Sequence, residues 1–152
     1  MLLTELLSLE RVRIPLHART KDELLRELVE VVSQGLPASA ADAVLAAVRE
    51  REQVLSTGIG HGVAIPHGKT PVVDQLLMAA GVTARPVDFD ALDGDPVELC
   101  FVLVGPESAA GAHVKALSRI SRLLRRAPLR DALRAAATPE EFLRVVGESE
   151  LA

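Results

Sequence analysis

The chain has 152 residues, of which 49% are hydrophobic, and a formal net charge of −4 at pH 7. This length suits a single domain over residues 1–152, large enough to form a core without disulfides or metal. Nucleic-acid binding is not expected, because the chain has no concentrated basic tract and its only aromatic residues are three Phe, with no Trp or Tyr.

No apolar run is long enough to span a membrane, and the apolar start of the chain carries Glu5 and lacks the basic segment of a signal peptide. We therefore expect a soluble protein of the cytoplasm. Cys100 is the only cysteine and lies in the apolar run 97–104, so we expect it to pack as a small core side chain rather than to act as a reactive thiol.

The first expected elements are a strand and a helix. Residues 12–14 alternate in polarity until Pro15, which predicts a short edge strand that ends there. Thr20 and Glu23 form a capping box ahead of apolar residues at helical spacing, and Gly35 ends this helix.

A second helix is expected to start at Ser39, which Asp42 follows at capping-box spacing, and to run to Glu52. This helix delivers Arg51 to the segment that comes next. Residues 63–65 then predict a short buried strand.

Two longer strands, 76–83 and 97–104, are separated by a turn signal at 93–96, and the second is expected at the centre of the sheet. A helix begins near Ala112 and points His113 inward with the apolar residues that follow. Its opposite face is either a solvated helix surface or a docking surface for an acidic partner. That face carries Lys115, Arg119, Arg122 and Arg126.

Two short helices complete the chain. Pro128 opens one that runs through Ala136. Thr138 and Glu141 form a capping box for the last helix, which Gly147 is expected to end. Strands that alternate with helices predict one sheet covered by helices, an α/β fold.

Residues 56–70 carry the strongest indication of a site. Three alternate glycines lie in this segment, at Gly58, Gly60 and Gly62. Glycine permits positive φ and lets backbone N–H groups approach a ligand closely, so we expect this segment to bind an anion such as phosphate. Pro66 then fixes the backbone that leads to His67.

Two nucleotide-binding motifs fail on spacing. The segment 68–70 has the sequence that ends a P-loop, but Val63 stands where the first glycine is required and Pro66 removes one phosphate-binding N–H. The dinucleotide-binding motif that would start at Gly58 also meets Val63 at the position of its third glycine.

The histidines of this segment, His61 and His67, leave a metal site or a phosphoryl-accepting histidine as alternatives. A metal site has little support, because the chain has one thiol and no pair of histidines at helical spacing, and we expect neither a metal nor an organic cofactor. His67 suits phosphoryl acceptance, since imidazole is partly uncharged near neutral pH and its ring nitrogen is a competent nucleophile. The structural alternative is a histidine that caps the end of a strand.

The residues from Arg51 to His67 resemble the signature of the mannitol/fructose-type enzyme IIA of the bacterial phosphotransferase system. The matching residues are Arg51-Glu52-x-x-x-Ser56-Thr57-Gly58-Ile59-Gly60-x-Gly62-x-Ala64-Ile65-Pro66-His67. The ending Pro66-His67-Gly68-Lys69 is most similar to the nitrogen-regulatory branch of that family. The resemblance continues through residues 89–106 to His113 and covers nearly the whole chain.

This resemblance implies a three-layer α/β/α sandwich with a central mixed sheet, and a phosphoryl carrier supplied ultimately by phosphoenolpyruvate. The carrier HPr, or its nitrogen-branch counterpart, would phosphorylate His67 at Nε2, a choice of nitrogen that the sequence itself does not make. The phosphoryl group would then pass to a fructose- or mannitol-type IIB partner, or the phosphorylation state would serve as a signal.

The resemblance also implies roles for other residues. Arg51 would stabilise the transferring group, whose charge is spread over three equatorial oxygens, and His113 would support His67 as a neutral imidazole at a helix start. The expected phosphate-binding group comprises Thr57, Gly58, Gly60 and Gly62. Threonine beside glycine is also an ordinary turn former, and His61 stands where the family has a small or polar residue, so its role stays open.

A different class of function remains an alternative. A non-enzymatic regulator or anion-binding module of the same fold would bind different proteins in its phosphorylated and unphosphorylated forms and would move no sugar. Phosphorylation adds about −1.5 to −2 charge at neutral pH, which is enough to change the surfaces that can dock.

Overall fold

The structure, a computed structural model, describes residues 2–151 and contains one mixed sheet covered on both faces by helices. The six strands are β1 (Val12–Leu16), β2 (Gly58–Gly60), β3 (Val63–Ala64), β4 (His67–Lys69), β5 (Leu77–Val87) and β6 (Val97–Gly105). The helices are α1 (Lys21–Val32), α2 (Ala38–Val54), α3 (Ala110–Leu123), α4 (Ala127–Ala135) and α5 (Pro139–Leu151). Short 3₁₀ turns lie at Leu3–Glu5, Leu9–Arg11 and Glu107–Ala109.

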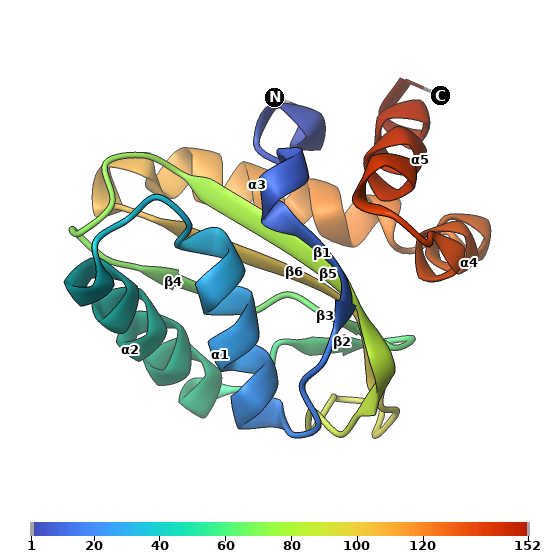
Figure 1. The fold of residues 1–152 in the computed structure, drawn as a ribbon, viewed down its shortest axis with the longest axis horizontal. Coiled ribbons are helices and arrows are strands. Elements are labelled where there is room, and N and C mark those ends of the chain that lie inside the picture. Colours follow the sequence, from blue (N-terminus) through green and yellow to red (C-terminus); the bar gives the residue numbers. More distant parts are fainter. Residues whose placement is uncertain (1, 152) are drawn as a thin grey trace.

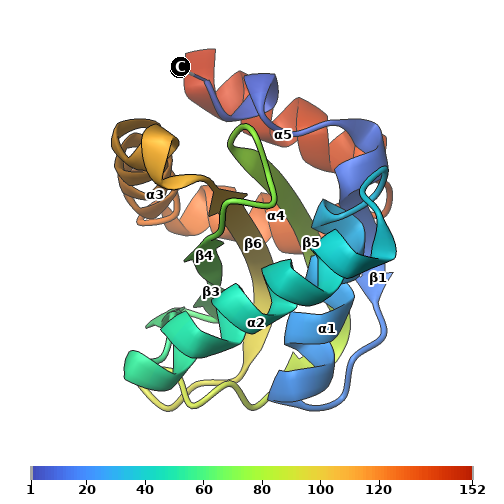
Figure 2. The same cartoon turned by 90° about the vertical axis from the view of Figure 1, so that its left-hand side faces the viewer.

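The strand order is β1-β5-β6-β3-β2, and β4 pairs with β6 beyond the end of β3. The β5–β6 and β2–β3 pairs are antiparallel, whereas β6 runs parallel to both β3 and β4. Helices α1 and α2 cover one face, and α3, α4 and α5 cover the other (Figures 1 and 2). The predicted three-layer α/β/α sandwich is therefore confirmed.

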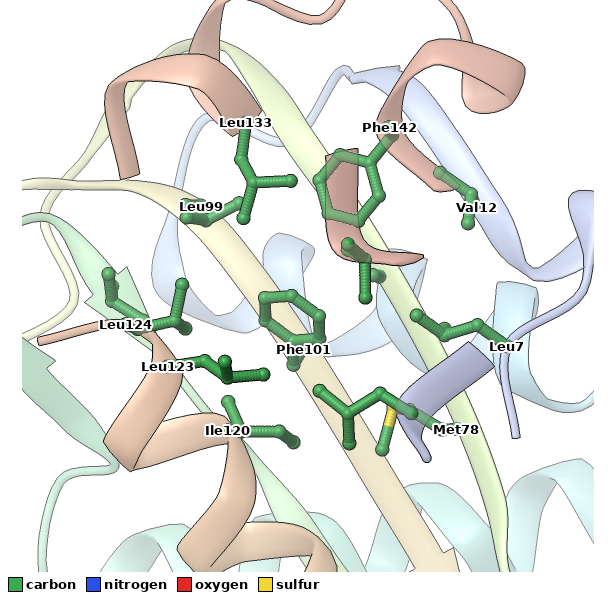
Figure 3. Close-up of a cluster of buried hydrophobic side chains, with 14 of the residues drawn as sticks. Leu7, Val12, Met78, Leu99, Phe101, Ile120, Leu123, Leu124, Leu133 and Phe142 are labelled. Atoms are coloured by element: carbon green, nitrogen blue, oxygen red, sulfur yellow. The ribbon is translucent and has the colours of Figure 1, made fainter. Parts of the chain in front are cut away.

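Strand β6 lies at the centre of the sheet, as predicted, and its side chains alternate between two hydrophobic cores. Leu99, Phe101 and Leu103 pack in the cluster under α3, α4 and α5, part of which Figure 3 shows. Cys100 and Val102 pack in the cluster under α1 and α2. Burial raises the pKa of the Cys100 thiol, so the prediction of an inert core side chain is confirmed.

Two of the three capping boxes predicted from the sequence are present. The Glu23 N–H donates to Thr20 Oγ1 at 3.2 Å, and the Glu141 N–H donates to Thr138 Oγ1 at 3.1 Å. Each satisfies a backbone donor that the first turn of a helix leaves without an intrahelical partner. The turn at 93–96 is also confirmed, with Gly94 at a φ of 79°.

The predicted start of the second helix at Ser39 is wrong. Helix α2 begins at Ala38, and the Pro37 carbonyl accepts the N–H groups of Ala40 and Ala41 at 3.0 and 3.1 Å. No side chain caps this end, because the N-cap residue is Pro37, whose side chain has no hydrogen-bond acceptor.

Two predicted ends are also wrong, for tertiary reasons. Strand β1 continues through Pro15 to Leu16, because it is an edge strand and the missing N–H of proline costs no ladder bond there. Helix α5 continues past Gly147 to Leu151. The Glu150 side chain, which is fully buried, holds this last turn by accepting N–H groups of the N-terminal segment and the Arg119 guanidinium.

None of the helices in the described part of the chain has the length and apolar character that a membrane crossing requires.

Candidate functional site

The candidate site lies where β4 meets α2 and α3, at one end of the sheet (Figure 2). His67 begins β4 and pairs in parallel with Leu103 of β6, rather than leaving a strand end as the sequence suggested. Gly68 lets α2 approach this strand, because a Cβ added there would lie 2.9 Å from the carbonyl carbon of Ala47. The close approach places Arg51, in the last turn of α2, at the same cavity as His67.

The His67 ring is held by a hydrogen bond within its own segment. Its Nδ1 lies 2.9 Å from the carbonyl oxygen of Ile65. A carbonyl oxygen can only accept, so Nδ1 carries the proton and Nε2 carries the lone pair. The structure therefore indicates which nitrogen is nucleophilic, a distinction that the sequence alone does not make.

The charge state of His67 follows from its surroundings. Partial burial lowers the pKa of His67, and the positive charges of Arg51 and Lys69 lower it further, while the Ile65 carbonyl and Glu52 act in the opposite direction. A lowered pKa keeps the ring neutral near pH 7, which is the form that can attack phosphorus.

His113 lies in the first turn of α3, faces inward as predicted, and is 2% exposed. Its ring contacts the His67 ring edge to face, with centroids 5.6 Å apart and planes at 66°. Burial first, and then the charges of His67 and Lys69, lower the pKa of His113 to about 4. Among the described residues neither of its ring nitrogens has a hydrogen-bond partner, so a neutral, unpartnered imidazole faces His67.

The two histidines share a cavity of about 490 Å³ with two cationic side chains. Arg51 is held at the end of α2 by a 2.9 Å bond to the Leu55 carbonyl, and Lys69 is 40% exposed and 4.0 Å from Glu107. Positive charge beside neutral imidazoles suits a phosphoryl group bound to a ring nitrogen. The lining residues are Ala47, Glu50, Arg51, Val54, His67, Gly68, Lys69, His113, Val114 and Leu117.

The structure places the predicted phosphate-binding group elsewhere. Within residues 2–151, Thr57, Gly58, Gly60 and Gly62 do not contribute to the lining of this cavity. Thr57 is buried and its hydroxyl donates to Glu52 at 2.6 Å.

The glycine segment forms a hairpin of β2 and β3 instead of an open loop. Gly58 packs against Ala91, where an added Cβ would lie 2.8 Å from the Ala91 Cβ, and its N–H donates to the Ser56 hydroxyl at 3.1 Å. The glycines at 60 and 62 have φ of 99° and 77°, which the tight turn between the strands requires. Protein atoms, rather than the anion expected from the sequence, therefore make the close approach that these glycines permit.

His61 is exposed at the tip of this hairpin with a φ of 57°. Its N–H donates to Asp93 at 3.0 Å and its carbonyl accepts from Arg134, which ties the tip to the loop before β6 and to α4. No group of three or more potential metal ligands occurs within the described residues.

Sequence reasoning missed three parts of this site. Lys69 could have been found from its spacing, because it stands two residues after His67 on a strand and so projects to the same side. Val54 and Val114 are 78% and 63% exposed and give the cavity an apolar rim, which helical spacing alone does not show. Glu52 is buried behind the site with no apolar pattern to predict its position.

An α/β sandwich in which two histidines and two cations line one cavity is compatible with phosphoryl transfer. A family model described as "Phosphoenolpyruvate-dependent sugar phosphotransferase system, EIIA 2" matches residues 5–149. The chain belongs to this family.

Particular relatives fall in two branches. The chain is similar to a nitrogen regulatory protein of Bradyrhizobium diazoefficiens, with 36% identity over 95% of this chain and 94% of the relative. It is also similar to the fructose-specific EIIABC component of Bacillus subtilis, with 33% identity over 99% of this chain but only 24% of that protein. Among solved structures it resembles the nitrogen regulatory protein IIA-Ntr of Neisseria meningitidis, with a TM-score of 0.87, 33% identity, and coverage of 95% and 98% of the two chains.

Proposed function

We propose that the protein is a phosphoryl carrier of the phosphoenolpyruvate-dependent phosphotransferase system and that Nε2 of His67 accepts the phosphoryl group. The observation that carries this proposal is the bond between His67 Nδ1 and the Ile65 carbonyl. It leaves the Nε2 lone pair as the nucleophile on a neutral ring that lines a cation-bearing cavity.

The transfer exchanges one phosphorus–nitrogen bond for another. The phosphohistidine of an HPr-like donor loses its bond to phosphorus as His67 Nε2 forms the new one, and the donor imidazole keeps the electron pair of the broken bond. Because the transition state is loose, the protein supplies alignment and positive potential more than covalent help. Arg51 of α2 and Lys69 of β4, which both line the cavity, provide that potential.

His113 supports this step as a positioning group. Its neutral ring faces His67, and the one ring nitrogen that carries a proton can donate a hydrogen bond to a phosphoryl oxygen once the group is in place. A pKa of about 4 keeps His113 uncharged at neutral pH. It therefore adds no positive charge that would weaken Nε2 of His67 as a nucleophile.

Two uses of the phosphoryl group follow from the two kinds of relative. A protein of the nitrogen-regulatory type signals through its phosphorylation state, and a protein of the fructose type passes the group to a IIB partner. We favour the regulatory use, because nitrogen regulatory relatives reach 37% identity to this chain and the fructose-specific relatives reach 33%.

Intact mass tests the carrier role directly. The protein is incubated with phosphoenolpyruvate, enzyme I and an HPr-like carrier near neutral pH, since phosphohistidine is acid-labile, in parallel with His67→Ala. We expect the mass of one phosphoryl group on the wild type and none on the variant. No gain with several donor pairs would instead favour a module that binds proteins or anions without accepting phosphate.

A further inference from the structure

Glu52, the residue after Arg51, is not among the residues that line the cavity in the described part of the chain and belongs to a buried polar cluster. Glu52 is 7% exposed. Its Oε1 accepts the Thr57 N–H at 2.9 Å and the Lys21 ammonium at 3.0 Å, and its Oε2 accepts the Thr57 hydroxyl at 2.6 Å. Lys21 also lies over the Phe89 ring, 4.7 Å from its centroid.

Helix stability does not explain this glutamate. It stands in the last turn of α2, where the partial negative charge of the helix end disfavours a carboxylate. Burial of a carboxylate costs several kcal/mol by itself, so its three donors mainly offset that cost. The arrangement fixes position more than it adds stability.

A short series of hydrogen bonds leads from Glu52 to the histidine ring. Glu52 holds the N–H and the hydroxyl of Thr57. The carbonyl of Thr57 accepts the N–H of Ile65 at 3.0 Å. The carbonyl of Ile65 in turn accepts Nδ1–H of His67. The Ile65 backbone therefore links the two ends of the series, because its N–H bonds to the residue that Glu52 holds and its carbonyl bonds to the His67 ring.

We propose that Glu52 is a positioning residue for His67. It fixes Thr57, and through Thr57 it fixes the Ile65 carbonyl that selects the Nδ1–H tautomer and directs Nε2 to the cavity. This inference rests on the proposed function, since the selected nitrogen matters only if His67 accepts a phosphoryl group. It also gives Thr57 a role in positioning the ring, in place of the phosphate contact expected from the sequence, because its hydroxyl is buried and bonded to Glu52.

Glu52→Gln tests the proposal with little change in volume. Glutamine offers one acceptor oxygen, and its NH₂ group must face either a Thr57 donor or Lys21, so the cluster cannot stay intact. We expect kcat for phosphoryl transfer to fall by about ten- to a hundredfold, the scale of a misplaced reacting group, with an unchanged KM for the donor. Long-range ¹H–¹⁵N NMR of unphosphorylated protein should show His67 as a single Nδ1–H tautomer in the wild type and as a mixture in the variant.

Glu150→Gln is the matched control. Glu150 is a buried, multiply bonded glutamate between the chain ends and Arg119, and it has no hydrogen bond to the series that leads to His67. Both variants should lower Tm, and only Glu52→Gln should change the tautomer and kcat. Equal kcat in the two variants, or an unchanged His67 tautomer in Glu52→Gln, would overturn the proposal.

Thr57 variants separate the hydroxyl from the backbone. Thr57→Ser keeps both bonds to Glu52 and should retain the wild-type tautomer of His67. Thr57→Val keeps only the N–H bond, so the population of the Nδ1–H tautomer should decrease. Identical spectra for the serine and valine variants would contradict the series. If the wild type takes up no phosphate, the proposed function fails, while the tautomer comparison still decides whether Glu52 positions the ring.

Discussion

The glycine hairpin and His67 come from one continuous stretch of sequence. The polar groups of the hairpin and those of the cavity around His67 are nevertheless arranged in opposite ways. In the hairpin the N–H groups of Gly58 and His61 are bonded to protein side chains, and the glycines allow close packing against neighbouring loops. In the cavity, His113 keeps both ring nitrogens unpartnered among the described residues, although it is buried. Buried polar groups without partners are costly, so the unpartnered ring of His113 marks the cavity, and not the hairpin, as the place that is kept for a ligand.

The largest effect on the rate of phosphoryl transfer, after loss of His67 itself, is expected at Arg51 in the cavity. Arg51→Ala should slow phosphoryl transfer by roughly two to three orders of magnitude, because a donor aimed at developing charge is lost. Arg49→Ala is the control on the same helix, since Arg49 forms its bonds with Asp22 outside the cavity. Rapid-quench measurement of His67 phosphorylation should show the loss in Arg51→Ala alone, and an unchanged rate there would exclude a role for its charge.

A smaller effect is expected at His113. His113→Ala should slow transfer by about ten- to a hundredfold without abolishing it, because His67 keeps its nucleophilic nitrogen but loses its neighbouring imidazole. His17→Ala, at an exposed position remote in sequence from the site, is the control. The same assay checks both, and a complete loss in His113→Ala, equal to that in His67→Ala, would contradict the assignment of His67 as the acceptor and His113 as its support.

The hairpin should respond in stability rather than in chemistry. Gly58→Ala brings a Cβ to 2.8 Å from the Ala91 Cβ, and overpacking of this kind costs about 1–3 kcal/mol of unfolding free energy. Gly111→Ala places its methyl in open space at the start of α3 and should stabilise by about 0.5–1 kcal/mol. Urea unfolding measures both values. A transfer rate that collapses in folded Gly58→Ala would show that the hairpin takes part in the chemistry.

A further effect on stability concerns acid pH. His113 titrates near its ordinary 6.5 when unfolded and at about 4 when folded, so the unfolded chain binds the extra proton first as pH falls. Stability from the neutral ring is complete above about pH 6.5 and decreases as pH falls toward about 4. His67, whose pKa is also lowered, mainly by burial, acts in the same direction.

His113→Gln should make this decrease shallower by at most about 1.4 kcal/mol per pH unit, which is the value for one proton. Urea unfolding at several pH values between 4 and 7 checks it in wild type and variant. Parallel curves for the two proteins would mean that His113 does not bind its proton more weakly in the folded state.

The sequence by itself determined the local elements and the family. Capping boxes at Thr20 and Thr138 and the continuous apolar run of β6 are local features of the sequence, so pattern and spacing predict them. The motif around His67 indicated phosphotransfer for the same reason, since its residues follow one another within one short segment, 51–67.

Only the tertiary structure decided how that stretch is divided. The glycine segment forms a hairpin because residues 89–93 and α4 pack against it. Helix α5 extends beyond Gly147 because Glu150 bonds to the N-terminal segment. The Nδ1–H tautomer of His67 depends on the direction of one carbonyl, and the bonds that set it begin at Glu52 and Lys21 on two helices. Such partners are distant along the chain, and no local periodicity encodes which buried acceptor a donor will meet in the packed fold.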